Sequence, residues 1–194
     1  MTSTLMKHPR KISPRALLVL VLAVLAQTAA AQRTTTTVIL VRHAEKAAEP
    51  AADPGLTPAG EARARGLVSV ARDAGVTAIV TTQFARTRAT AQPIAAALHI
   101  TPDVIDARGA QHAQEVARLI MTKHAGEVVL VVGHSNTIPA IVAALGAPQP
   151  SAICDAEYDG LYIVTVPPGG AAHVIRARYG EPTAVAEGCA AMTR

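Results

Sequence analysis

Apolar positions along the chain fall into short runs rich in Val and Ile and longer stretches with helical spacing. The short runs predict strands, because β-branched residues favour extended backbone. The longer stretches are bounded by capping and breaking residues and predict helices. We expect strands at 37–41, 76–81, 101–105, 128–132, 160–166 and 172–178. We expect helices from 57 to about 74, then at 86–98, 113–124 and 137–145.

Individual residues support these helix boundaries. Thr57 is a good N-cap and is followed by Pro58 at the first helical position, while Gly75 stands where that helix should end. Pro93 lies within the second helical stretch and predicts a kink or a break into two helices, because proline lacks the backbone N–H.

The order of these elements predicts an α/β fold. Strands that alternate with helices of this length form a mainly parallel sheet with helices on both faces, a three-layer sandwich. Residues 167–170, Pro-Pro-Gly-Gly, join the last two strands and read as a hairpin turn. We therefore expect one antiparallel edge strand.

The first 31 residues have the layout of a secretory signal peptide. Four basic residues precede the apolar run 16–26, and small residues follow up to Ala31, which we take as the cleavage position. An uncleaved membrane anchor is the alternative, but the run is shorter than the roughly 20 residues of a spanning helix. We expect one mature domain, 32–194, in the periplasm or secreted, with no stable membrane insertion after cleavage.

Charge and histidine spacing narrow the possible partners. Four of the 18 Lys and Arg lie in residues 1–31, so the mature chain carries 14 charges of each sign, and the high pI gives no support for nucleic-acid binding. Several histidines are scattered without ligand spacing, so we expect neither a metal site nor a cofactor. These histidines are His99, His112, His124 and His173.

The two cysteines, Cys154 and Cys189, both lie in the mature chain. An exported protein meets oxidising conditions, so a disulfide between them is plausible, and two unpaired thiols are the alternative. Neither cysteine lies in a metal-ligand pair or beside a histidine, which gives neither a catalytic role.

Two predicted strands end in histidine. Residues 38–41 run into Arg42 and His43, and residues 128–132 run into Gly133 and His134. In open α/β sheets, ligands bind outside the carboxyl ends of the strands. A neutral imidazole there can attack phosphorus, and arginine matches a phosphoryl group bidentately. These strand ends therefore predict a phosphoryl-transfer site.

Further residues could complete such a site. Either Arg86 or Arg88, at the start of the second helix, could supply another cation. The backbone amides of Ser135 and Asn136, at a helix N-terminus, favour an anion. A serine hydrolase is disfavoured, because its nucleophile elbow needs a glycine on both sides of Ser135 and Asn136 breaks that pattern.

Four segments resemble the histidine phosphatase superfamily, the phosphoglycerate-mutase-like group, in its smaller branch. Residues 42–46 resemble the family's Arg-His-Gly or Arg-His-Ala signature, and 56–60 are similar to its Leu-Thr-x-x-Gly helix start. Residues 82–91 resemble Ser-x-Leu-x-Arg-Ala-x-x-Thr-Ala, and 133–136 resemble the signature of the second histidine. The four motifs come in family order, and the resemblance covers nearly all of 37–179.

The resemblance implies a role for each matching residue. His43 would be the phosphorylated nucleophile, with Arg42, His134 and Arg86, rather than Arg88, binding the phosphoryl group. Asp106, just after the third predicted strand, would be the general acid, although its surroundings depart from the family's Leu-x-Glu pattern. Glu45 reads as a structural or solvated carboxylate.

The implied activity is that of an exported, metal-independent phosphatase that acts on a small phosphate ester or a phosphoprotein through a phosphohistidine. The alternative is a non-catalytic envelope module that binds a phosphorylated ligand in the same anion pocket. A missing proton donor would favour this binding module.

Overall fold

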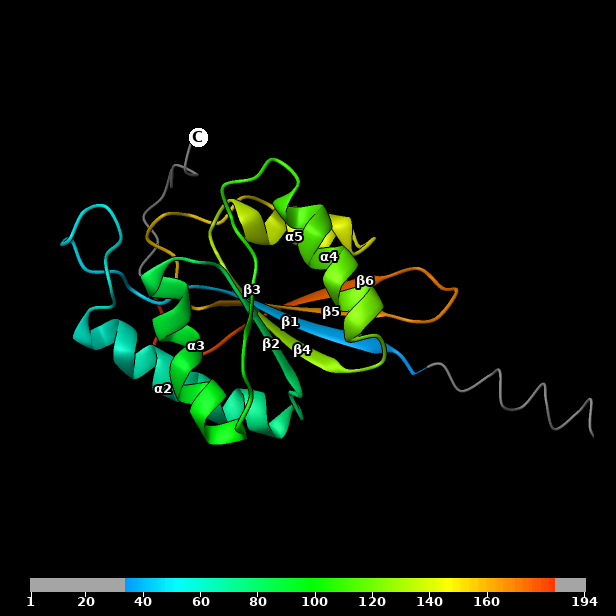
Figure 1. Ribbon diagram of the computed structural model, residues 1–194, viewed down its shortest axis with the longest axis horizontal. Helices are drawn as coiled ribbons and strands as arrows, with labels where there is room; N and C mark the ends of the chain where they lie inside the picture. Colours follow the sequence, from blue (N-terminus) through cyan, green and yellow to red (C-terminus); the bar gives the residue numbers. More distant parts are fainter. Residues whose placement is uncertain (1–33, 184–194) are drawn as a thin grey trace, which may run out of the picture. The chain divides into compact units, whose positions relative to one another are not determined.

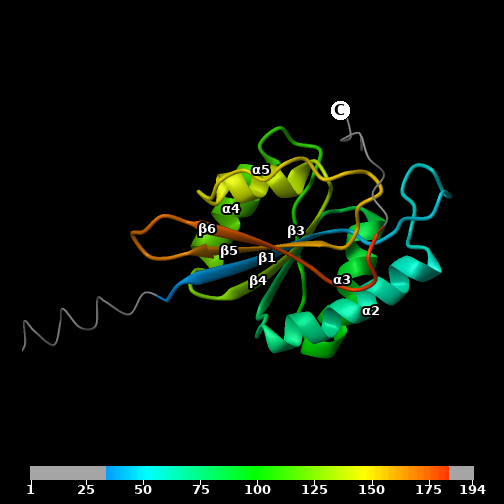
Figure 2. The same cartoon turned by 180° about the vertical axis from the view of Figure 1, so that it is seen from behind.

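The predicted strands all join one sheet, in the order β3-β2-β4-β1-β5-β6 (Figure 1). The computed structural model describes residues 34–183, and the sheet consists of β1 (Thr36–Arg42), β2 (Ala78–Thr81), β3 (Asp103–Val104), β4 (Val128–Gly133), β5 (Gly160–Val166) and β6 (His173–Arg178). The four strands β1, β2, β3 and β4 are parallel to one another, whereas β5 is antiparallel to both of its neighbours. Figure 2 shows β5 and β6 together at this edge. The predicted α/β class, with its antiparallel edge, is confirmed.

Two pairs of helices cover the two faces of the sheet (Figure 1). α2 (Pro58–Asp73) packs with α3 (Ala85–Leu98), and α4 (His112–Lys123) packs with α5 (Thr137–Ala144). The chain therefore forms the three-layer sandwich expected from its sequence.

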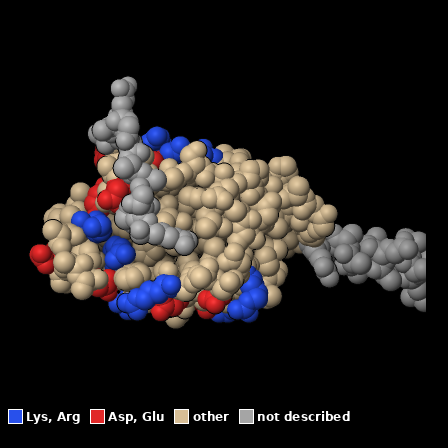
Figure 3. All heavy atoms as spheres, turned by 90° about the horizontal axis from the view of Figure 1, so that it is seen from above, with Lys and Arg blue, Asp and Glu red and all other residues tan. Residues whose placement is uncertain are grey.

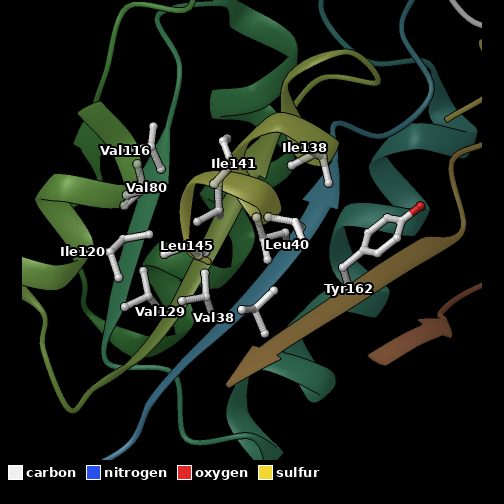
Figure 4. Close-up of a cluster of buried hydrophobic side chains, with 14 of the residues drawn as sticks. Val38, Leu40, Val80, Val116, Ile120, Val129, Ile138, Ile141, Leu145 and Tyr162 are labelled. Atoms are coloured by element: carbon white, nitrogen blue, oxygen red, sulfur yellow. The ribbon is translucent and has the colours of Figure 1, made fainter. Parts of the chain in front are cut away.

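Alternation along the central strands divides the core into two layers. In β1, Val38 and Leu40 face α4 and α5, whereas Ile39 and Val41 face α2 and α3. Figure 4 shows Val38 and Leu40 among side chains of α4 and α5, including Ile141. A strand buried on both faces has no polar side, which explains why β1 reads as an unbroken apolar run.

Two elements differ from the sequence prediction. α3 continues through Pro93 without a break. Pro93 has no N–H to donate to the preceding turn of the helix. The burial of Ala91 and Ile94 against the sheet compensates for this missing hydrogen bond. β3 shortens to two residues, because it lies at the sheet edge and follows Pro102, which has no N–H to donate.

Several expectations concern residues outside 34–183. The proposed signal peptide, 1–31, and Cys189 are not among the described residues, so leader cleavage and the pairing of Cys154 with Cys189 stay predictions. Within 34–183, no helix has the length and hydropathy needed to cross a membrane. On the face shown in Figure 3, basic and acidic side chains are interspersed, as the balanced charge of 32–194 implies.

Candidate active site

The carboxyl ends of β1 and β4 bring the two predicted histidines together. Arg42 pairs with Gly133 in the sheet, and the His43 amide donates a 2.9 Å hydrogen bond to the Gly133 carbonyl. The imidazole rings of His43 and His134 lie edge to face, with 5.4 Å between their centroids. Residues 91 positions apart in the sequence thus face each other because their strands are parallel neighbours.

His43 is held in the form that a nucleophile needs. Its Nδ1 lies 2.8 Å from the Ala44 carbonyl oxygen. A carbonyl can only accept, so Nδ1 carries the proton and Nε2 keeps its lone pair. Burial lowers the pKa of His43 to about 3. The hydrogen bond to the Ala44 carbonyl opposes this shift, and the positive charges of Arg42 and Arg86 reinforce it. The imidazole is therefore neutral near pH 7.

His134 is buried beside a threonine and an aromatic ring. Its Nε2 lies 3.1 Å from the Thr82 hydroxyl, and its ring meets the edge of Phe84 at 5.3 Å between centroids. Burial lowers its pKa to about 3, and the neighbouring His43 and Arg86 act in the same direction. An anion bound next to it would favour its protonated form, so His134 can become a further positive donor beside Arg42 and Arg86.

Arg42 is fully buried and bound to the loop before β5. Its Nη1 donates to the carbonyl oxygens of Cys154, Asp155 and Glu157, and its Nη2 contacts the Asp155 carboxylate at 2.8 Å. The guanidinium lies 4.3 Å from the centre of the Tyr158 ring. These contacts fix the charge of Arg42 at the end of β1.

Arg86 brings a second guanidinium to the same place from the start of α3. It stacks 4.4 Å from the centre of the Phe84 ring, and its Nη1 lies 3.7 Å from the Asp53 carboxylate. Asp53 also accepts hydrogen bonds from the Ala85 amide at the first turn of α3. Arg88 is exposed instead. Of the two arginines that the sequence offered, only Arg86 lies beside the histidines.

Threonine hydroxyls attach α3 to the strand end that carries His43. Thr90 accepts from the Ala44 amide at 2.9 Å and donates to the Arg86 carbonyl at 2.8 Å. Thr87 is buried and bonds to Thr82 at 2.8 Å. His43, His134 and Arg86 are thus linked by short side-chain hydrogen bonds that involve threonines of α3.

Three buried polar atoms of this region have no hydrogen-bond partner within residues 34–183. They are Nε of Arg42, Nε of Arg86 and the Ser135 hydroxyl. Unpaired buried donors are rare in folded proteins, because each loses its hydration without replacement. With two guanidinium charges beside two neutral imidazoles, they make a site suited to an oxyanion.

Asp106 and Asn136 lie at the rim rather than at the histidines. The Asp106 carboxylate accepts from the Gln83 side chain and the Arg108 amide, both at 2.8 Å, and is exposed. Asn136 is also exposed, at the N-cap of α5. Among residues 34–183, the predicted acid therefore forms no hydrogen bond with His43.

Glu45 has a structural role. Its carboxylate receives three hydrogen bonds from the buried guanidinium of Arg63, which also donates to the Tyr179 carbonyl. The Glu45 carbonyl accepts the Thr57 amide at 2.9 Å, and a Cβ on Gly60 would lie 2.3 Å from it. Only glycine at position 60 lets α2 approach the segment after His43 this closely.

Sequence reasoning missed Thr82, Asp53 and Tyr158. Thr82 carried a usable signal, because it directly follows the last residue of β2 at the same sheet edge. Asp53 and Tyr158 lie in loops, and their contacts with Arg86 and Arg42 depend on tertiary structure. Among the described residues, no group of three or more His, Cys, Asp and Glu side chains could hold a metal ion.

The lowered histidine pKa values predict acid sensitivity. Unfolded histidines bind protons near pH 6.5, whereas folded His43 and His134 resist protonation down to about pH 3. The free energy of unfolding should therefore be intact above pH 6.5 and decrease below it, by up to about 1.4 kcal/mol per pH unit for each histidine. Urea unfolding at pH 7.5 and 5 should show a decrease about 2 kcal/mol smaller in His134→Gln than in the wild type. His173→Gln, at an exposed position, is the control, and equal decreases in all three proteins would contradict the prediction.

Comparison with known proteins finds similarity in sequence motifs and in fold. The family model of the histidine phosphatase superfamily (branch 1) matches residues 38–109. The solved protein histidine phosphatase SixA bound to tungstate is 16% identical, with a TM-score of 0.60 over 73% of this chain and 96% of that chain. SixA of Agrobacterium tumefaciens is 25% identical, with a TM-score of 0.50 over 75% and 98%. Mycobacterial hydrolase 2 is 15% identical, with a TM-score of 0.57 over 79% and 94%.

No curated protein sequence matches the chain. The family match runs from β1 to the loop that carries Asp106. It includes the strand end that carries His43 and the helix start that carries Arg86. The solved structures share the sheet and its flanking helices. The chain thus matches the model of the histidine phosphatase superfamily (branch 1) over residues 38–109 and shares the fold of solved phosphatases.

Proposed function

We propose that this protein is a phosphatase that hydrolyses phosphomonoesters, or a phosphoprotein, through a phosphohistidine on His43. The proposal rests on the protonation state and the hydrogen bonding of His43. His43 is buried and neutral, its Nδ1 proton is committed to the Ala44 carbonyl, and its Nε2 lone pair remains for attack. Solved phosphatases with this fold support the assignment at the level of the reaction class.

The proposed reaction has two steps. In the first, Nε2 of His43 bonds to phosphorus as the bond to the leaving oxygen breaks, while Arg42, Arg86 and His134 offset the charge on the phosphoryl oxygens. In the second, water bonds to phosphorus and gives a proton to the carboxylate that protonated the leaving oxygen, and the bond to His43 breaks, which releases inorganic phosphate and restores the imidazole. The residues require no metal for either step.

The leaving oxygen needs a proton, and we assign it to Asp106. This carboxylate lies in the loop after β3 and contacts Gln83, the neighbour of the Thr82 that bonds to His134. Protonation matters most for alkoxide leaving groups, because they are poor without it, and little for nitrophenolate. Asp106 should therefore affect the two kinds of substrate unequally.

We also propose that the protein acts after export, in the periplasm or outside the cell, once residues 1–31 are removed. The layout of that segment supports the proposal, namely basic residues, a short apolar run and a small-residue ending at Ala31. An uncleaved leader would instead anchor the same domain to the membrane.

Turnover by the exported protein tests the proposed function. The chain is isolated from the cell envelope, its mass is measured against that of residues 32–194, and hydrolysis of para-nitrophenyl phosphate is followed with a chelator present. We expect turnover that the chelator does not reduce. Asp106→Asn should lose about 100-fold with an alkyl phosphate and a few-fold at most with the nitrophenyl ester.

The outcomes separate the enzyme from the binding module. Absence of turnover with every phosphoester, together with retained binding of phosphate, would contradict the phosphatase and favour the non-catalytic reading. Equal losses with both esters in Asp106→Asn would remove Asp106 from the role of acid while leaving the phosphatase intact. Glu115→Gln, an exposed carboxylate on α4, is the matched control.

A further inference from the structure

A cavity of about 450 Å³ lies between the loop after β3 and the first turn of α5. We call it the rim cavity and define it by its polar side chains, Arg108, His112, Gln114, Asn136 and Thr137. The remaining lining residues are small, four alanines and one glycine. No carboxylate and no large apolar side chain lines it, so the cavity suits a polar ligand and not an aromatic or aliphatic one.

The rim cavity adjoins the His134 side of the candidate active site. Asn136 follows Ser135 and His134 directly along the chain, and His112 is close enough for its charge to lower the pKa of His134. The Phe84 ring that meets His134 at 5.3 Å also has the Arg108 guanidinium 5.4 Å from its centre. A molecule with its phosphoryl group between the histidines can therefore extend into this cavity.

Arg108 gives the rim cavity a positive charge that the phosphoryl chemistry does not use. Its guanidinium is exposed, and no acidic side chain in residues 34–183 forms an ion pair with it. It shares the Phe84 ring with Arg86, which lies 4.4 Å from the ring centre. The two guanidiniums are thus held at one aromatic side chain, one beside the histidines and one at the cavity.

The backbone adds to this preference for negative charge. The first turns of α4 and α5 both line the rim cavity, through His112 and Thr137. The amides of His112 and Thr137 already donate to the carbonyls of Gly109 and His134, so these helix ends contribute only the partial positive charge of the helix dipole. Together with Arg108, these helix ends favour an anionic ligand over a cationic one.

We propose that the rim cavity binds the leaving group of the substrate and that Arg108 selects a second anionic group on it. The inference rests on the proposed function and narrows its substrate class to small phosphomonoesters with a carboxylate or a second phosphate. The size of the cavity and its small lining residues suit a compact metabolite, so a phosphoprotein becomes the competing outcome.

Matched alkyl phosphates test this inference. The esters carry two to four carbons and end in a carboxylate, a hydroxyl or an ammonium group. We expect wild-type kcat/KM to be highest for the carboxylates, and Arg108→Glu to lower the carboxylate-to-hydroxyl ratio about tenfold or more, mainly through KM. The ammonium esters should improve relative to the hydroxyl esters in the same variant. Arg118→Glu, on the exposed side of α4, is the control that should leave both ratios unchanged.

Binding measurements keep the test independent of turnover. Calorimetric dissociation constants for the same esters should show the carboxylate preference in the wild type and its loss in Arg108→Glu, even if the protein hydrolyses none of them. Equal effects of Arg108→Glu on all three ester types would overturn the inference. Hydrolysis of a phosphorylated protein domain at a higher kcat/KM than any small ester would also overturn it.

Discussion

Replacing His43 with glutamine should reduce kcat for phosphomonoester hydrolysis by about 10⁴-fold or more, because no other group offers a lone pair at that point. His134 cannot substitute, since its Nε2 is engaged by Thr82. Glutamine keeps a polar side chain of similar size, so the change is confined to the nucleophile. Steady-state assays with para-nitrophenyl phosphate provide the measurement.

The covalent intermediate gives this prediction a second readout. Protein mixed with a ³²P-labelled phosphomonoester and quenched in alkali, where a phosphoramidate survives, should carry label in the wild type. His43→Gln should carry none, and His173→Gln should be labelled like the wild type. Label that persists in His43→Gln would assign the nucleophile to another residue and refute the proposed mechanism.

Replacing Arg42 with methionine should lower the free energy of unfolding by about 3 kcal/mol. The side chain donates to three carbonyl oxygens and one carboxylate of the loop before β5, and methionine fills the space without replacing any of these bonds. The buried carbonyls would lose their partner. Urea unfolding at pH 7.5 measures the change.

The same substitution should also reduce kcat/KM by about 100-fold, since one of the two fixed positive charges beside His43 disappears. Arg65→Met is the matched control, because Arg65 is 64% exposed and, among residues 34–183, pairs only with Glu61 on the surface of α2. A surface pair contributes about 0.5 kcal/mol or less. Equal stability losses in the two variants would contradict the structural role of Arg42.

Much of the fold could be predicted because single-residue signals coincided with tertiary structure. Thr57 and Pro58 mark the start of α2, and the unbroken apolar run of β1 indicated a strand covered on both faces. The break predicted at Pro93 is wrong, because here the local signal and the tertiary structure oppose each other. The local cost of the proline is real, but the burial of Ala91 and Ile94 outweighs it, and no local pattern reveals that burial.

The residues of the candidate site also separate into those that the sequence could predict and those that it could not. His43 and His134 could be predicted to meet because each ends a strand of one parallel sheet, and adjacent parallel strands end at the same edge. Asp53 and Arg108 could not, because their contacts with Arg86 and Phe84 join loops whose paths the sequence does not specify. Loop residues reach a site by tertiary packing, and they determine what it binds.

The close approach of Gly60 to Glu45 couples the backbone of α2 to the segment that follows His43. The helix sets how far the chain beyond His43 can move, because its backbone and that of Glu45 are already at contact distance. A side chain introduced at position 60 would clash with the backbone of Glu45, two residues after His43. The position of the proposed nucleophile should therefore depend on a residue of an outer helix.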